Sequence, residues 1–209
     1  FYIFFENKIK NIIKDKKILV ERTGSFFFKT KYKFKNLKKY QIKSHNSDEL
    51  IKLINKNKID YLLNSETPNR LNSKILNSTK GIISIHPGIL PNYRGCTCLE
   101  WSLNKNDPVA ITAFLMNRKY DAGPIIKTLI LKFKKNEIKS YRDLRTKAYL
   151  NSFSLFKKIL INISRNKLKA TKQNKKKAKY YKVIDNKKLE KIKFKIEKKI
   201  YVFNKRNLI

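Results

Sequence analysis

The fold prediction starts from residues 81–95, which read Gly81-Ile-Ile-Ser-Ile-His86-Pro-Gly-Ile-Leu-Pro91-Asn-Tyr-Arg94-Gly95. The first residues of this stretch are mostly apolar and β-branched, which predicts a buried strand over Gly81–Ile85 that ends at His86. A turn rich in Pro and Gly follows at once. In an open parallel sheet, ligands bind just outside the carboxyl ends of the strands. His86 is therefore a candidate site residue, although a lone histidine is more often structural.

Glycine and proline gather around this strand. Four of the five glycines and four of the five prolines lie between Gly81 and Pro124. Such residues set turns and let backbones approach closely, so we expect shaped loops and the site in this part of the chain. Asp121 lies in one of these loops, where small neighbours let another group approach its carboxylate. Together His86 and Asp121 are interpreted as an acid–base pair, because a carboxylate favours a protonated imidazole.

The rest of the chain alternates predicted strands and helices. The predicted strands are Phe1–Phe5, Ile18–Glu21, Asp60–Leu63, Val109–Met116 and Pro124–Leu131. The predicted helices are Asn7–Lys17, Leu50–Asn55, Leu71–Leu76, Thr97–Leu103 and Tyr141–Ile163. Phe26–Lys39 shows no clear period and is interpreted as irregular. This alternation predicts an α/β fold with an open, largely parallel Rossmann-like sheet.

The composition changes near residue 165. Residues 166–209 are rich in Lys and Asn, so we interpret them as a short basic C-terminal extension of a domain that spans residues 1–165. The chain begins with Phe, which predicts that the first strand of the domain is missing. A missing strand exposes a sheet edge, and a homodimer or a longer natural chain are two ways to cover it.

The chain of 209 residues is strongly basic, with 51 Lys+Arg, 15 Asp+Glu and a net charge of +36. Basic chains attract polyanions by releasing counterions, but specific phosphate and base contacts favour Arg over Lys, and nearly all these cations are Lys. Two interpretations of this charge stay open: a basic surface that is merely solvated, and a non-specific contact with polyanions through the tail. No apolar run approaches the roughly 18–20 residues of a membrane span, so no membrane contact is expected. The chain has two cysteines, Cys96 and Cys98, too few for a four-Cys zinc site or a disulfide scaffold. We therefore expect a cytoplasmic protein without a metal.

Several separated motifs together resemble one known family. They are residues 81–95, Glu100-Trp-Ser-Leu, Asp107-Pro-Val and Tyr120-Asp121-Ala-Gly-Pro-Ile-Ile126. In this order they resemble the folate-dependent formyltransferases, which include glycinamide ribonucleotide, methionyl-tRNA and amino-sugar formyltransferases. The resemblance is strongest over residues 41–132. It implies the formyltransferase type of Rossmann-like fold and the transfer of a formyl group from 10-formyltetrahydrofolate to a primary amine.

The resemblance also implies catalytic roles. The family stabilises the reaction's oxyanion with an Asn-x-His pair, and an Asp charges the His and moves protons through water. His86 and Asp121 match these positions, whereas Ser84 stands where the family has Asn. A hydroxyl is a shorter single donor, and losing one oxyanion donor lowers the rate by about 10²–10³-fold. Three readings of Ser84 follow: a weakened catalyst, a competent one that uses a water or a neighbouring donor, and a site without turnover.

Further positions are assigned to ligands by the same resemblance. Arg70 and Leu71 match a loop that contacts the pterin of the donor, and Asn117 and Tyr120 belong to the loop that lines the pterin pocket. Arg94 either binds an anionic acceptor or anchors its loop. The acceptor is undetermined, with an amino-sugar nucleotide or a methionyl-tRNA-like amine favoured. The alternatives are a formyltetrahydrofolate hydrolase and a non-catalytic remnant that binds folate or polyanions.

Overall fold

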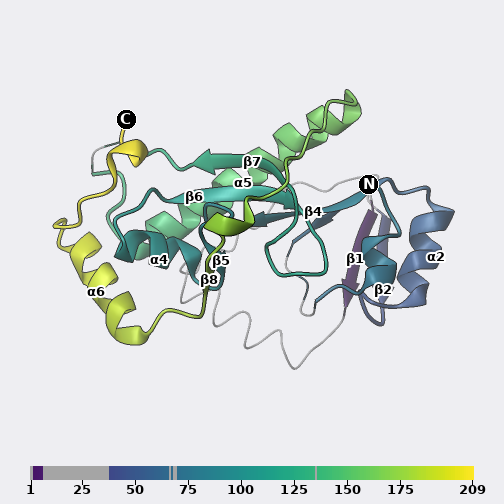
Figure 1. Cartoon of the computed structure of the whole chain (residues 1–209), viewed down its shortest axis with the longest axis horizontal. Coiled ribbons are helices and arrows are strands. Elements are labelled where there is room, and N and C mark those ends of the chain that lie inside the picture. The colour runs from purple at the N-terminus through teal and green to yellow at the C-terminus, as the bar shows by residue number, and fades with distance from the viewer. Residues whose placement is uncertain (1, 7–37, 66, 68–69, 135) are drawn as a thin grey trace. The chain divides into compact units, whose positions relative to one another are not determined.

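The computed structural model describes residues 2–6, 38–65, 67, 70–134 and 136–209 (Figure 1). The chain divides into two compact units, residues 1–82 and 83–209, and the boundary falls inside strand β4 (Gly81–His86). The helix predicted over Asn7–Lys17 and the strand predicted over Ile18–Glu21 lie outside the described residues, as does most of the segment interpreted as irregular.

Unit 1 contains a pair of parallel strands, a further strand and two helices. These are β1 (Tyr2–Glu6), β2 (Lys38–Ile42), α2 (Asp48–Lys56), β3 (Tyr61–Asn64) and α3 (Ser73–Leu76). Helix α2 covers the predicted helix Leu50–Asn55 and begins two residues earlier, after a cap in which the Ser47 hydroxyl accepts a hydrogen bond of 3.3 Å from the Leu50 amide. The side chain of Asn72 caps α3 in the same way, accepting a 3.0 Å hydrogen bond from the Ile75 amide.

Unit 2 holds the remaining elements. After the end of β4 they are β5 (Arg94–Gly95), α4 (Cys98–Asn104), β6 (Ala110–Leu115), β7 (Ile125–Ile130), α5 (Tyr141–Ser164), the 3₁₀ turn η1 (Lys175–Lys177), β8 (Tyr180–Tyr181), α6 (Asn186–Glu197) and the 3₁₀ turn η2 (Lys205–Asn207). Strand β6 pairs with β4 on one side and with β7 on the other. The side chains of β6 from Ala110 to Phe114 are buried, so this strand forms the centre of the core of unit 2.

The predicted open α/β sheet is confirmed, but its strand directions are mixed rather than largely parallel. Pairs β1–β2 and β5–β8 are parallel, whereas β4–β6 and β6–β7 are antiparallel. The connection from β4 to β6 contains the turn after His86, strand β5 and helix α4, and it brings β6 back antiparallel to β4. The short connection 116–124 likewise reverses the chain between β6 and β7.

Helix α5 follows its sequence signals closely. Its first turn carries a capping box, in which the Ser140 hydroxyl accepts from the Asp143 amide and the Asp143 carboxylate accepts from the Ser140 amide. Its buried side chains recur at helical spacing and include Leu144, Leu155 and Ile159. The predicted helix is confirmed, but the buried face differs in part from the predicted apolar face: Leu144 and Ile159 are buried as expected, whereas Phe153, which the sequence pattern places on that face, is 65% exposed.

Residues 166–209 pack on the rest of unit 2. Thr171 forms an antiparallel bridge with Ile125 beside β7, and β8 lies beside β5 (Figure 1). Helix α6 contacts both α4 and α5, and Leu208 bridges to Phe133. Unit 2 thus includes this segment, while a domain boundary after residue 165 stays a prediction of the sequence.

Asn207 is expected to be the most costly polar residue of this segment to remove. It is fully buried; its Oδ1 accepts from the Val109 amide at 3.0 Å, and its Nδ2 donates to the carbonyls of Val109 (2.8 Å) and Leu131 (2.7 Å). Asn207→Ala removes all three hydrogen bonds, and only the Val109 carbonyl keeps a second partner, the Leu131 amide, so we expect the free energy of unfolding to fall by about 2–3 kcal/mol. Urea unfolding followed by circular dichroism measures this change.

The matched control for that variant is Asn204→Ala. Asn204 is only partly buried; its Nδ2 donates to the Asn106 carbonyl at 2.9 Å and its Oδ1 accepts from the Arg206 amide at 3.0 Å. Water can replace these contacts, so we expect a loss below about 1 kcal/mol. Equal losses in the two variants would contradict the role given to Asn207.

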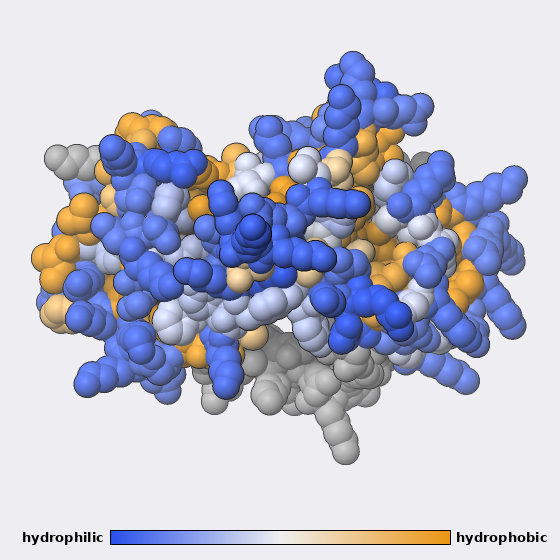
Figure 2. Space-filling model, viewed as in Figure 1, coloured by the Kyte–Doolittle hydropathy of each residue, from blue (hydrophilic) through white to orange (hydrophobic). Residues whose placement is uncertain are grey.

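The visible surface reflects the net charge of +36, because hydrophilic side chains cover most of the face in Figure 2. Apolar side chains appear there as scattered patches between the charged ones. Among the helices that the structure describes, none has both the length and the hydropathy to cross a membrane.

Candidate functional site

His86 is the last residue of β4 and is buried, with 5% of its surface exposed. Its Nε2 lies 2.7 Å from the Tyr93 carbonyl oxygen, and its Nδ1 lies 3.5 Å from Oδ1 of Asp121. A carbonyl oxygen only accepts, so Nε2 carries a proton and donates it to Tyr93. Ser84 precedes His86 by two residues on β4, so the two side chains share one face of the strand.

Asp121 lies on the loop between β6 and β7 and has a backbone φ of +50°, in the left-handed region. Asp is one of the few side chains that adopt this conformation without large cost. Its Oδ2 accepts a hydrogen bond of 2.8 Å from the Gly95 amide, while its Oδ1 faces His86. The structure thus brings together the two residues that the sequence interpretation pairs.

The protonation of His86 is set by opposing influences. Burial lowers the pKa of His86 below its ordinary value, whereas the Asp121 carboxylate and the hydrogen bond to Tyr93 raise it, and burial is the stronger of these. The sequence predicts an imidazole that Asp121 keeps protonated. The structure gives Asp121 a more limited effect, because its charge offsets only part of the desolvation of His86.

Two glycines give this site its shape. A Cβ on Gly88 would lie 3.0 Å from Nε2 of His86 and 2.8 Å from the Cβ of Cys98. A Cβ on Gly123 would lie 1.7 Å from the Leu115 carbonyl oxygen, so only glycine lets the Asp121 loop close onto the end of β6. The expectation that small residues allow close approaches in this region matches these contacts.

Arg94 and the residues before Asp121 surround this pair. Arg94 is buried; its Nε and Nη2 donate to Gln173, at 3.1 and 2.6 Å, and its Nη1 donates to the Tyr180 hydroxyl at 3.2 Å. This is the geometry of a loop anchor, one of the two roles that the sequence leaves open, and acceptor binding stays a prediction. Asn117 and Tyr120 are exposed on the loop that carries Asp121.

The other two residues assigned to the donor lie in unit 1. Leu71 is buried there, and Arg70 is exposed while its carbonyl accepts a hydrogen bond of 2.9 Å from Asn46. Their proposed contact with the pterin stays a prediction, since the other predicted site residues belong to unit 2.

Sequence reasoning did not single out Gln173 or Tyr180. Gln173 Nε2 donates to the carbonyls of Asp121, at 3.0 Å, and Gly123, at 2.6 Å, and the Tyr180 hydroxyl donates to the Tyr120 carbonyl at 2.9 Å. Both residues come from the segment interpreted as an extension. No local pattern marks Gln173; for Tyr180 the available signal is the aromatic pair Tyr180-Tyr181 in a segment rich in Lys and Asn.

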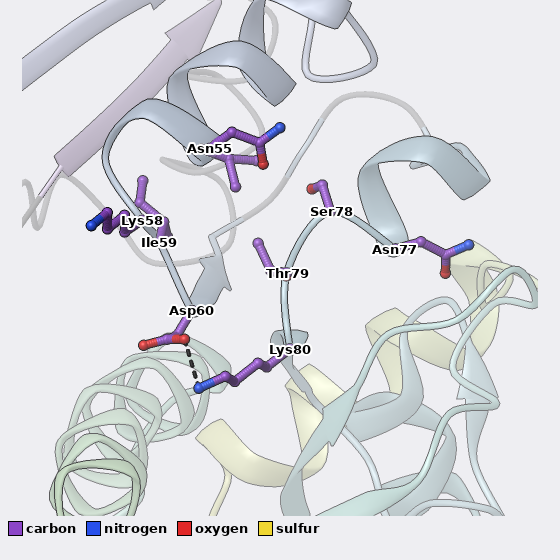
Figure 3. A pocket seen from close by; sticks show the side chains of 9 residues that line it. Asn55, Lys58, Ile59, Asp60, Asn77, Ser78, Thr79 and Lys80 are labelled. Carbon is purple, nitrogen blue, oxygen red and sulfur yellow. Dashed lines mark ion pairs between the residues drawn. The ribbon is translucent and has the colours of Figure 1, made fainter.

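A separate cavity of about 460 Å³ opens in unit 1 (Figure 3). It is lined by Ile54, Asn55, Lys58, Ile59, Asp60, Asn77, Ser78, Thr79 and Lys80. Asp60 and Lys80 form an exposed ion pair at 2.8 Å across it. None of the predicted site residues lines this cavity, and it carries no pair like His86 and Asp121. In the described part of the chain, no group of three or more His, Cys, Asp or Glu side chains is placed to hold a metal ion.

Comparison with known proteins identifies the family. The sequence profile described as formyl transferase matches residues 6–147 of the 209, so the chain belongs to this family. The chain is 31% identical over 104 residues to a methionyl-tRNA formyltransferase of Mycoplasmopsis pulmonis, a match that covers 47% of this chain and 36% of that protein. The chain therefore spans well under two thirds of this curated relative.

Solved structures share the fold. A 4-N formyltransferase from Francisella tularensis matches with a TM-score of 0.55 at 22% identity, over 88% of this chain and 76% of that one. The formyltransferase PseJ from Anoxybacillus kamchatkensis, in complex with UDP-4,6-dideoxy-4-formamido-L-AltNAc and tetrahydrofolate, matches with a TM-score of 0.56 at 17% identity, over 90% and 89% of the two chains. At these identities the likeness concerns the fold alone.

Proposed function

We propose that this protein transfers a formyl group from 10-formyltetrahydrofolate to a primary amine. The observation that carries the proposal is the buried pair of His86 and Asp121 at the end of β4, in a chain that belongs to the formyl transferase family. The solved complex of PseJ with tetrahydrofolate supports a folate donor.

The proposed roles follow from proton balance. A bond forms between the amine nitrogen and the formyl carbon while the bond to the donor nitrogen breaks, so the amine loses a proton and the donor nitrogen gains one. Asp121 is proposed to move this proton through water, because its partly exposed carboxylate lies 3.5 Å from the imidazole. His86 is proposed to donate its Nε2–H to the developing oxyanion, which then takes the place of the Tyr93 carbonyl as acceptor.

The acceptor is proposed to be the amine of an amino-sugar nucleotide or of methionyl-tRNA. Relatives whose names state each of these classes support both choices. The lysine-rich surface supports an additional non-specific contact with polyanions, and the free thiols of Cys96 and Cys98 are in keeping with a cytoplasmic setting.

The test is turnover of 10-formyltetrahydrofolate with each class of amine, followed as tetrahydrofolate appears. Turnover that depends on one amine supports the proposal and identifies the acceptor. Formate release without any amine would indicate a hydrolase instead. Binding of the donor without turnover would indicate a non-catalytic remnant.

Ser84→Asn is expected to raise turnover by about 10²–10³-fold. The variant restores the carboxamide donor that the family places two residues before the histidine, and one such donor contributes this much to the rate. The measurement is kcat with the amine that the turnover assay identifies as the acceptor. Ser84→Ala serves as the matched control, because it removes the hydroxyl and adds no donor. An unchanged kcat in Ser84→Asn would show that Ser84 already serves the reaction, or that another donor has taken its place.

A further inference from the structure

We propose that Gln173 is a positioning residue, which holds the loop of Asp121 in the conformation that places its carboxylate on His86. The effect of Gln173 on the reaction rests on the proposed function. The contacts from which the positioning role is inferred all lie within unit 2. Nothing in the sequence signals this role, because Gln173 lies far along the chain from both residues.

The first step is the hydrogen bonding of the Gln173 amide. Its oxygen accepts from Nε of Arg94 at 3.1 Å and from Nη2 at 2.6 Å. Its nitrogen donates to the carbonyls of Asp121, at 3.0 Å, and Gly123, at 2.6 Å. A carboxamide has two acceptor sites and two N–H donors, so all of its capacity is used. One side chain therefore ties the loop of Arg94 to the loop of Asp121.

The second step is the backbone conformation of Asp121. Its φ of +50° lies in the left-handed region, which Asp adopts more readily than most residues but which is one of several conformations open to it. The two carbonyls bound by Gln173 belong to Asp121 itself and to Gly123, two residues later. The contacts thus fix the peptide groups on the carboxyl side of Asp121 and limit their rotation.

The third step concerns the partner of the carboxylate. Oδ2 of Asp121 accepts from the Gly95 amide at 2.8 Å, and Gly95 pairs with Tyr181 in the β5–β8 ladder. The neighbouring Arg94 amide donates to the Lys179 carbonyl at 2.9 Å. The same segment, residues 171–181, therefore holds both ends of the hydrogen bond between Gly95 and Asp121.

Tyr180 supports the same arrangement from a second direction. Its hydroxyl donates to the Tyr120 carbonyl at 2.9 Å and accepts from Nη1 of Arg94 at 3.2 Å, and the guanidinium carbon lies 5.3 Å from the centre of its ring. Arg94 thus donates to neutral partners, and within the described residues no carboxylate lies within ion-pair distance of its guanidinium. The Asp121 carboxylate is left to Gly95 and His86.

The experiment compares Gln173→Ala and Gln173→Glu with the control Asn174→Ala. Glu keeps the size of the side chain and its acceptors toward Arg94, but it lacks the N–H groups that hold the carbonyls of Asp121 and Gly123. Asn174 is the neighbouring residue and caps only the η1 turn, through a 3.0 Å hydrogen bond from the Lys176 amide. Both Gln173 variants are expected to lower kcat by about 10–100-fold, as small misplacements of reacting groups do. The KM for the formyl donor should change less than about threefold.

A second readout does not depend on turnover. The chain has two histidines, so in a His45→Gln background the imidazole NMR signals report His86 alone. The Asp121 carboxylate faces the imidazole, and Tyr93 contacts it through its backbone carbonyl; burial raises the pKa of the neighbouring Cys98 thiol, which therefore stays protonated near neutral pH. Loosening Asp121 weakens the influence that raises the pKa of His86, so in Gln173→Ala this pKa should fall. Gln173→Glu adds a negative charge of its own, which opposes that fall, so it serves the kcat comparison alone.

Each outcome decides the matter. A lower His86 pKa in Gln173→Ala, with the Asn174→Ala control unchanged, supports the positioning role even if no amine is formylated; in that case only the proposed function fails. An unchanged His86 titration in a folded Gln173→Ala protein overturns the inference. A loss of kcat that merely follows a loss of thermal stability, with the titration unmoved, overturns it as well.

Discussion

Asp121→Asn is expected to lower formyl transfer by about 10²–10⁴-fold while the protein stays folded. Asparagine is nearly isosteric, so its side-chain oxygen still accepts from the Gly95 amide, a hydrogen bond of 2.8 Å in the structure. The variant loses the negative charge 3.5 Å from Nδ1 of His86 and the ability to take up a proton. Because the site is largely buried, that charge is weakly screened and its removal strongly felt.

The pH dependence of this variant follows from the same pair. Burial lowers the pKa of His86 and the Asp121 carboxylate raises it. Without the carboxylate, less remains to counter the effect of burial. The pKa of His86 should therefore fall further in Asp121→Asn. In both proteins the neutral imidazole is favoured by folding, so its contribution to stability is present above about pH 6.5 and declines as the pH falls below that value.

The control for Asp121→Asn is Asp60→Asn. Asp60 is an exposed carboxylate of unit 1 that pairs with Lys80 at 2.8 Å, and such surface pairs contribute little. Turnover should be unchanged in this control. A rate in Asp121→Asn within about threefold of the parent protein would mean that Asp121 takes no part in the proton transfer.

Glu100→Gln is expected to lower the free energy of unfolding by about 3–5 kcal/mol. Glu100 lies in α4 with 1% of its side chain exposed, and its Oε1 accepts from the Tyr141 hydroxyl and from Nη1 of Arg145 at 3.2 Å. Arg145 is itself 6% exposed. The variant leaves a buried guanidinium without its counter-charge, a large loss against a typical total of about 5–15 kcal/mol.

Urea unfolding measures this loss, with Glu190→Gln as the control. Glu190 pairs with Lys193 at 2.7 Å on the exposed side of α6, so its removal should change stability by less than about 0.5 kcal/mol. Replacing both members of the buried pair, as Glu100→Leu with Arg145→Met, should recover part of the stability. A loss below about 1 kcal/mol in Glu100→Gln would show that Arg145 does not depend on this carboxylate.

Elements with local signals were predictable from the sequence. The predicted helices Leu50–Asn55 and Tyr141–Ile163 match α2 and α5 to within two residues at each end. The run of Ile residues before His86 likewise gives β4 and its end. In these segments the information lies within a few turns of chain, which is the range over which caps and periodicity act.

Strand direction and the role of the C-terminal segment were not predictable in this way. Antiparallel pairing of β4 with β6 depends on how a short helix returns the chain, which no local pattern encodes. Residues 166–209 look like a basic extension because their composition is dominated by Lys and Asn. Their contacts with unit 2 are long-range, as when Asn207 reaches Val109 or Gln173 reaches Arg94.

The candidate site was likewise predictable from the sequence only in part. His86 and Asp121 could be named because each stands in a motif with a known chemistry, and the structure places them 3.5 Å apart. Gln173 stands in no motif and shows its part only through the groups that it joins. The reduced effect of Asp121 on the protonation of His86 also needs the structure, because burial cannot be read from the motif.

The most direct test of the central claim is a single-turnover experiment with 10-formyltetrahydrofolate and excess protein, in which tetrahydrofolate and the formylated amine are both quantified. The parent chain and His86→Ala are compared with amino-sugar nucleotides and with methionyl-tRNA. We predict that tetrahydrofolate and one formylated amine form in equal amounts, and that His86→Ala lowers the rate by at least about 10²-fold. Equal rates in the two proteins, or tetrahydrofolate formed with formate and no formylated amine, would contradict the claim.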